Sequence, residues 1–243
     1  MSTTYITLCN DLLRRLNEVA FVTSGDGFDT AKNVQAIAKD AINNAIREIL
    51  QDGHQFPFLK TTATQTLTAG TGTYDFPADT ASVDWDTFYL QALSSANNSA
   101  RALSVVSFEQ YVRLYKSIEE NSGTSARTAP NIIYQTAEEK FGITPIPDAA
   151  YIVEYVYYKF PSDLILFSDT MIIPDRFKYI IIDGAMTYMM RFRSNEQSAQ
   201  IHQQKFKEGV KSMRRLLLDD PLSVRSTVVN RPRYSSHMLS LSS

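Results

Sequence analysis

The first and last parts of the chain carry apolar residues at helical spacing. The clearest stripe runs from Val34 to Leu50, where an apolar side chain recurs every three or four residues and polar side chains fill the other face. A second stripe begins at Tyr5 and reaches about Val19, after which residues 24–27 break the pattern. Both stripes predict amphipathic helices that bury one face.

Two further helices are predicted after residue 173. Pro174 suits the first turn of a helix that extends to about Arg193 and is apolar on nearly all sides, so most of it should be buried. Asn195 can cap a last long helix, whose apolar stripe faces a side rich in glutamine, lysine and arginine. Pro221 is expected to end it.

The middle of the chain has a different pattern. A threonine-rich run at 61–67 and the segment 74–77, joined by the Gly70–Gly72 turn, predict a β-hairpin. Alternation from Ala150 to Phe160 predicts a strand with Tyr151, Val153, Tyr155 and Tyr157 on one face. The other elements expected here are strands at 84–93 and 132–134, a short helix from Ser107 and a loop at 119–128.

These elements predict an α+β chain that is mainly α. The long N- and C-terminal helices are expected to form a bundle, with the β-rich subdomain inserted between them. The expected divisions are 1–59 and 162–220 for the two halves of the bundle, 60–161 for the β-rich insertion and 221–243 for an extended C-terminal tail. The tail has no acidic residue and no regular period, so it has no core of its own.

Charge and cysteine content narrow the class of protein. The chain has 243 residues and a formal net charge of −2, which argues against bulk binding of nucleic acid. Its one cysteine, Cys9, lies on an apolar helix pattern and predicts a reducing compartment. No basic region followed by an apolar run opens the chain, and no apolar stretch reaches about 18 residues, so neither a signal peptide nor a membrane span is expected.

Residues suited to catalysis are sparse. The histidines, His54, His202 and His237, are each expected at the surface, and no cysteine or histidine spacing resembles a zinc site, so neither a metal nor a cofactor is predicted. Gly70 and Gly72 lack the third glycine and the helix of a dinucleotide loop. Carboxylates are more plentiful, and a peptidoglycan hydrolase would need two of them roughly 5–10 Å apart. The candidates are Asp75, Asp79, Asp84, Asp86, Glu119 and Glu120, for which solvated turns and strand edges are the simpler interpretation.

The tail and the tyrosine-rich strand each allow two interpretations. The arginines of the tail are interleaved with apolar residues, which suits docking along a protein groove better than weak, salt-sensitive binding to DNA. Tyr151, Tyr155, Tyr157 and Tyr158 can stack on bases, but in an alternating strand tyrosines more often pack a sheet and a subunit contact.

The order of several short segments points to a family. Phe56–Leu59 ends a long helix, the segments Thr71–Asp79 and Phe141–Asp148 follow, and Ile173–Phe177 precedes a helix through Gly184–Ala185. In this order they resemble the head-to-tail adaptors, or tail tubular protein A family, of short-tailed phages, over about residues 5–220.

This resemblance implies a structural protein of the virion, assembled in the host cytoplasm, without catalytic residues. It implies a self-assembled ring of twelve below the portal protein, a C-terminal tail that reaches the portal, a tail tube or nozzle at the other end and passage of the genome through the lumen. The portal-docking residues implied for the tail are Arg225, Val228, Val229, Arg231, Pro232, Arg233 and Tyr234. The subunit contacts implied for the last two helices are Arg176, Tyr188, Arg191, Lys207, Lys211, Arg214 and Arg215.

Two alternatives stay open at this point. One is another virion module that binds the host or tethers DNA, which strong salt-dependent DNA binding by the tail would favour. The other is the peptidoglycan hydrolase, which requires two of the candidate carboxylates to face one cleft.

Overall fold

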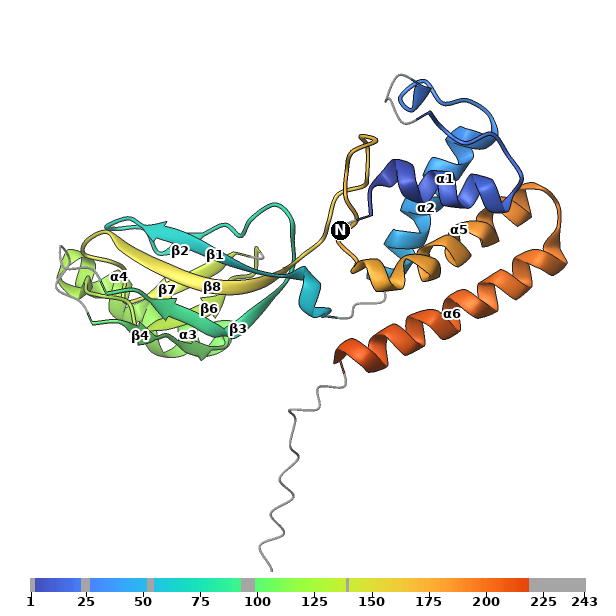
Figure 1. The fold of residues 1–243 in the computed structure, drawn as a ribbon. Helices are drawn as coiled ribbons and strands as arrows, with labels where there is room; N and C mark the ends of the chain where they lie inside the picture. The colour runs from blue at the N-terminus through green and yellow to red at the C-terminus, as the bar shows by residue number, and fades with distance from the viewer. Residues whose placement is uncertain (1–2, 23–26, 52–54, 93–98, 139, 219–243) are drawn as a thin grey trace, which may run out of the picture.

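The structure is a computed structural model that describes residues 3–22, 27–51, 55–92, 99–138 and 140–218. The predicted tail, with all seven candidate portal-docking residues, lies outside this range, as do His54 and His237. Figure 1 shows two parts side by side, one helical and one β-rich. The helical part combines residues from both ends of the described chain, and the β-rich part contains its middle.

The four helices predicted from the apolar stripes are present. They are α1 (Tyr5–Arg15), α2 (Val34–Gln51), α5 (Lys178–Phe192) and α6 (Glu196–Leu218). α1 ends before Val19 because Asn17 adopts a positive φ of 56°, which turns the chain out of the helix. α5 is preceded by a 3-10 turn, η6 (Asp175–Phe177), and Asn195 caps α6 by accepting a hydrogen bond from the Ser198 amide.

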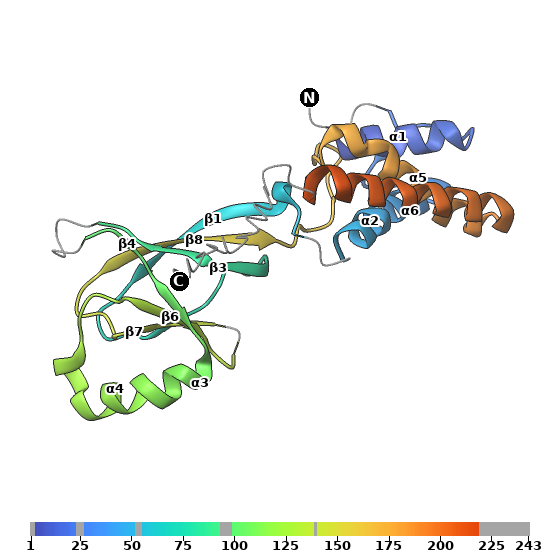
Figure 2. The ribbon, with the colours of Figure 1, turned by 90° about the horizontal axis from the view of Figure 1, so that it is seen from below.

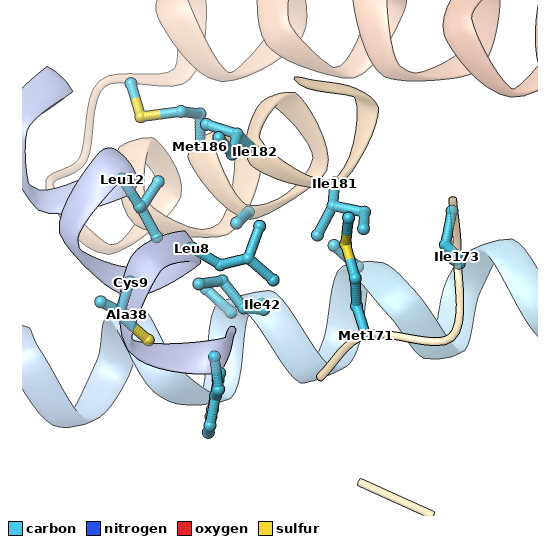
Figure 3. Close-up of a cluster of buried hydrophobic side chains, with 14 of the residues drawn as sticks. Leu8, Cys9, Leu12, Ala38, Ile42, Met171, Ile173, Ile181, Ile182 and Met186 are labelled. Atoms are coloured by element: carbon cyan, nitrogen blue, oxygen red, sulfur yellow. The ribbon is translucent and has the colours of Figure 1, made fainter. Parts of the chain in front are cut away.

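These helices share one hydrophobic core. α5 packs against α1, α2 and α6, and its glycine Gly184 lets the Phe206 ring of α6 and the Ala45 methyl of α2 approach closely. Figure 3 shows side chains of α1, α2 and α5 meeting in this core, together with Met171 and Ile173 from the segment before α5. The apolar stripes of the sequence therefore mark the buried faces.

The prediction of a mainly α chain with a bundle of N- and C-terminal helices is wrong. The described residues include two four-stranded sheets, so strands are a major part of the fold. α2 runs across α1 and α5 in Figure 1 instead of lying alongside them, and the helices gather around α5. Periodicity shows which face of a helix is buried but not the angle at which its neighbour crosses, which depends on how the side chains interdigitate.

The β-rich part contains two sheets that lie close together in Figure 2. The first has the order β1 (Lys60–Leu67), β8 (Tyr151–Lys159), β3 (Thr80–Leu90) and β4 (Arg101–Ala102). The second has the order β2 (Thr73–Tyr74), β7 (Phe141–Thr144), β6 (Ile132–Gln135) and β5 (Ser104–Val106). A 3-10 turn, η2 (Pro57–Leu59), leads into β1.

The predicted hairpin between the first two strands does not form. β1 pairs with β8 and β2 pairs with β7, so the turn at Gly70–Gly72 connects two different sheets. Alternate residues of β8 are buried in the core between the sheets, where the rings of Tyr155 and Phe88 stack with centroids 4.6 Å apart. Burial raises the pKa of Tyr155 to about 12. Tyr151, Tyr155 and Tyr157 therefore pack the sheet, and none is free to stack on a base.

A helical segment covers the outer side of the second sheet. It consists of α3 (Phe108–Tyr111), a π-helical turn η4 (Val112–Lys116), α4 (Ser117–Ser122) and a 3-10 turn η5 (Gly123–Ala126). The expected helix start at Ser107 is confirmed by a capping box with Gln110, but the loop predicted at 119–128 is helical in its first part.

The predicted division of the chain after residue 59 and after residue 161, on either side of the β-rich insertion, stays a prediction.

Candidate interaction surfaces

A groove with basic walls runs along the second half of α6. It has a volume of about 630 Å³ and is lined by Glu48, Phe206, Lys207, Val210, Lys211, Arg214, Arg215 and Leu218; we call it the α6 groove. Phe206 and Val210 are buried and form part of an apolar floor, while the four cationic residues are exposed. Their spacing of four, three and one residues brings them to one side of the helix.

The structure brings four of the predicted subunit-contact residues together in this groove. These are Lys207, Lys211, Arg214 and Arg215, which face one carboxylate, Glu48 of α2. Within the described part of the chain, none of the four forms an ion pair with a carboxylate. The groove is thus a cationic surface with an apolar base, suited to an apolar segment that carries negative charge.

The other three predicted contact residues lie outside this lining. Tyr188 is next to it, because its hydroxyl donates to Glu48 Oε2 at 3.2 Å, and burial together with the charge of Glu48 raises the pKa of Tyr188. Arg191 donates to Gln203 Oε1 at 3.2 Å and thereby joins α5 to α6. Arg176 lies over the ring of Phe177, 4.7 Å from its centroid.

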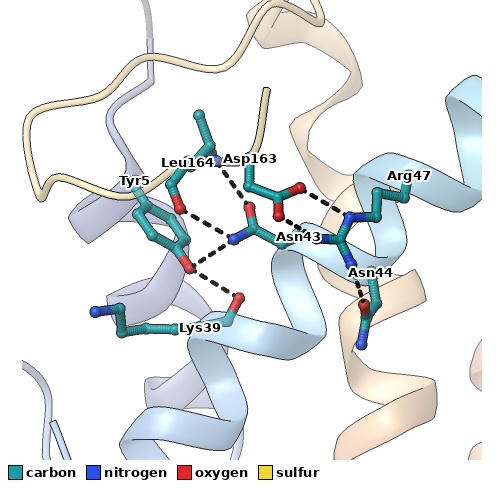
Figure 4. A network of polar contacts seen from close by, with 7 residues as sticks. All are labelled: Tyr5, Lys39, Asn43, Asn44, Arg47, Asp163 and Leu164. Atoms are coloured by element: carbon teal, nitrogen blue, oxygen red, sulfur yellow. Dashed lines mark hydrogen bonds and ion pairs between the residues drawn. The ribbon is translucent and has the colours of Figure 1, made fainter. Parts of the chain in front are cut away.

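A second surface was not predicted from the sequence. Residues 163–169, between β8 and η6, form a loop that we call the knob loop. Figure 4 shows the Asn43 side chain of α2 bound to both backbone polar groups of Leu164. Its Nδ2 donates to the Leu164 carbonyl at 3.0 Å, and its Oδ1 accepts from the Leu164 amide at 3.1 Å. Arg47, one turn further along α2, binds both carboxylate oxygens of Asp163.

The rest of the knob loop is fixed by its own carboxylate and by α1. Asp169 Oδ2 accepts hydrogen bonds from the amides of Ile165 and Leu166, each at 2.8 Å. The Tyr5 amide donates to the Asp169 carbonyl at 2.7 Å. Burial raises the pKa of the Tyr5 phenol, and the negative charges around it, including Asp169, raise it further. The backbone of this loop is therefore ordered at several points.

The side chains of the knob loop are nevertheless exposed. Ile165 is 67% exposed and Leu166 is 53% exposed, and Phe167 beside them is 36% exposed. An apolar run that is held in place but left in water is typical of a protein docking surface. The signal in the sequence was four consecutive apolar residues, 164–167, between two aspartates, in a segment where no strand or helix was predicted.

Five of the six candidate carboxylates for hydrolysis are held by different partners, including Glu120, which pairs with Lys116. Asp79 accepts from the Tyr157 hydroxyl, Asp84 pairs with Lys60, and Glu119 accepts from the hydroxyls of Tyr111 and Thr144. Asp75 pairs with Lys140, which also pairs with Glu138. The side chains of Asp75 and Glu138 are 79% and 77% exposed, so both carboxylates lie largely in solvent.

Among the residues that the structure describes, no group of three or more histidine, cysteine or carboxylate side chains is placed to hold a metal ion. None of the helices described is both long enough and apolar enough to cross a membrane. The surface position predicted for His202 is wrong. This histidine pairs with Asp183 of α5 at 3.1 Å, and only 19% of its side chain is exposed.

Comparison with known proteins places the chain in a family. No curated protein matches it. The model of the SU10 adaptor protein family matches residues 3–232, which includes the α6 groove, the knob loop and both sheets. This match extends over most of the chain and agrees with the resemblance to phage head-to-tail adaptors. The chain belongs to the SU10 adaptor protein family and is a structural adaptor protein of a phage particle.

Proposed function

We propose that the protein forms a ring of twelve subunits between the portal protein and the tail tube or nozzle of a phage, and that the genome passes through its lumen. The family match over residues 3–232 carries this proposal. Twelve subunits and the position below the portal follow from the resemblance to head-to-tail adaptors. A net charge of −2 supports the lumen role, because a nearly neutral subunit does not retain the DNA that passes.

Two surfaces of the helical part support the formation of a ring. A ring of identical subunits needs two different faces on each subunit, so that each copy contacts the next in the same way. The α6 groove and the knob loop are two such faces. In this arrangement Lys207, Lys211, Arg214 and Arg215 contact a neighbouring subunit, and Arg176, Tyr188 and Arg191 are further candidates.

The C-terminal tail is proposed to dock on the portal. Its candidate contact residues are Arg225, Val228, Val229, Arg231, Pro232, Arg233 and Tyr234, which mix apolar anchors with guanidinium groups. A segment without a core becomes ordered when it binds its partner, and this coupling makes assembly sequential. The free subunit is then expected to remain monomeric at ordinary concentrations.

Native mass spectrometry of the protein mixed with the portal assembly of its phage tests this function. We expect a mass that exceeds the mass of the portal by twelve subunits, and a truncated chain without residues 221–243 should bind at least tenfold more weakly. A protein that never binds the portal, with or without its tail, would rule out the adaptor arrangement.

A further inference from the structure

We propose that the knob loop of one subunit inserts into the α6 groove of a second copy of this chain. The inference rests on the proposed ring and specifies which two faces meet in it. The geometry that carries it is a loop with an ordered backbone and exposed apolar side chains, together with a groove of matching chemistry on the same molecule.

The knob loop is preorganised for docking. Asn43 and Arg47 hold its first residues, Asp169 holds the amides of Ile165 and Leu166, and Ile6 donates to the Phe167 carbonyl at 3.2 Å. Because these contacts exist in the single subunit, little conformational entropy is lost when the loop binds. Water remains around Ile165 and Leu166, so burial of these side chains is available to drive association.

The groove matches the loop in both apolarity and charge. Phe206, Val210 and Leu218 offer an apolar floor for side chains of the size of isoleucine and leucine. The rim carries four cations and one carboxylate. The loop presents its apolar residues between Asp163, whose charge Arg47 balances, and Asp169. The exposed Asp40 of α2 adds a second negative charge, and it follows Lys39, whose carbonyl accepts from the Tyr5 hydroxyl. Attraction between these charges fixes the orientation of the two subunits.

The positions of the two surfaces suit a contact that repeats from subunit to subunit. Asn43 and Arg47 of α2 face the knob loop, whereas Glu48 faces the groove, so the surfaces lie on different sides of α2. In Figure 1 the loop projects beside the start of α1, away from α6. A subunit thus keeps its own groove free after its loop has docked, and the contact can propagate into a closed ring.

Cross-linking between two single-cysteine variants tests this contact directly. A tagged chain with L166C and a chain carrying K211C are mixed on the portal assembly of the phage, where the ring is proposed to form, and exposed to a mild oxidant. The tag distinguishes the mixed dimer from dimers of one variant. The matched control replaces K211C by Q200C, which places the cysteine at an exposed position of α6 outside the groove. The buried native Cys9 is common to all chains.

We expect L166C to cross-link to K211C at least tenfold faster than to Q200C, and 0.5 M salt should reduce this preference by screening the charges. Equal rates for the two partners would overturn the proposal, and faster cross-linking of L166C to another L166C would show a symmetric dimer instead. The L166K variant, which brings a positive charge to the cationic groove, separates the two proposals in the portal assay. We expect this variant to lose the twelve-subunit complex. If the variant still forms the complex, the knob contact is refuted but the proposed ring is not. If the unmodified chain fails to bind the portal, the ring itself is refuted.

Discussion

At Gly184, α5 approaches both α2 and α6 closely. A methyl group added to its Cα would lie 2.7 Å from Phe206 Cε2 of α6 and 2.9 Å from the Ala45 Cβ of α2. Carbon atoms in contact are ordinarily about 3.5–4.0 Å apart, so G184A requires α5 to move away from at least one neighbour. The Ala45 methyl is fixed to its backbone and cannot rotate away.

The expected effect of G184A on stability is opposite to the usual effect of replacing a helical glycine by alanine. In a helix interior, replacement of glycine by alanine ordinarily raises the free energy of unfolding by about 1 kcal/mol. Overpacking of a core costs about 1–3 kcal/mol, and two tight neighbours favour the upper half of that range. We therefore expect G184A to lower the free energy of unfolding by about 1–2 kcal/mol, which corresponds to a fall in Tm of about 2–8 °C for a chain of this size.

Urea unfolding followed by circular dichroism measures this change, and G27A is the matched control. Among the described residues, no heavy atom beyond the chain neighbours of Gly27 lies within 4 Å of the Cβ that G27A would add. The free energy of unfolding of G27A should therefore stay unchanged or rise by less than about 1 kcal/mol. A double variant with F206A should show a coupling of about 1 kcal/mol with G184A. If G184A instead stabilises the protein by about 1 kcal/mol, the close packing of α5 described here is incorrect.

Three further predictions concern other parts of the molecule. G142A places a methyl against the Tyr134 ring, well inside van der Waals contact, and should lower the free energy of unfolding in urea by about 3 kcal/mol. Unchanged stability would contradict the contact. Burial raises the pKa of Cys9 to about 12, so an alkylating reagent at pH 8 should label it only after unfolding; labelling at the rate of a free thiol would refute its burial. Hydrogen bonds from Thr3 lower the pKa of Asp175, so the ionised carboxylate stabilises the folded chain. The unmodified chain should therefore have a higher Tm than D175N at pH 7, and this difference should be lost as the pH falls below about 4. A difference in Tm that does not depend on pH would disprove this linkage.

Local patterns were sufficient to predict the helices and one long strand. The stripe from Val34 to Leu50 matches α2, and the alternation around Tyr155 matches β8, because one face of each element is buried in a single core. Pairing between distant segments was not predictable in the same way. β1 pairs with β8, more than eighty residues away in the chain, and the turn residues between β1 and β2 resemble those of a hairpin. Helix crossing angles were missed for a related reason, since they depend on the shapes of both partners.

The candidate surfaces were predicted in part. Polar residues on the last helix pointed to Lys207, Lys211, Arg214 and Arg215, and helical geometry gathers these four in one groove. The apolar floor and Glu48 come from other turns and another helix, so only the folded chain shows them. The knob loop has no periodicity, and its order depends on hydrogen bonds from α1 and α2 that the sequence does not reveal.

Electron cryomicroscopy of the phage neck without imposed symmetry tests most directly whether this adaptor forms a ring between the portal and the tail. We expect twelve copies of the helical and β-rich parts directly below the portal, with the knob loop of each copy seated against α6 of its neighbour. Density for this chain at any other place in the particle, or a neck without a ring of these subunits, would contradict it.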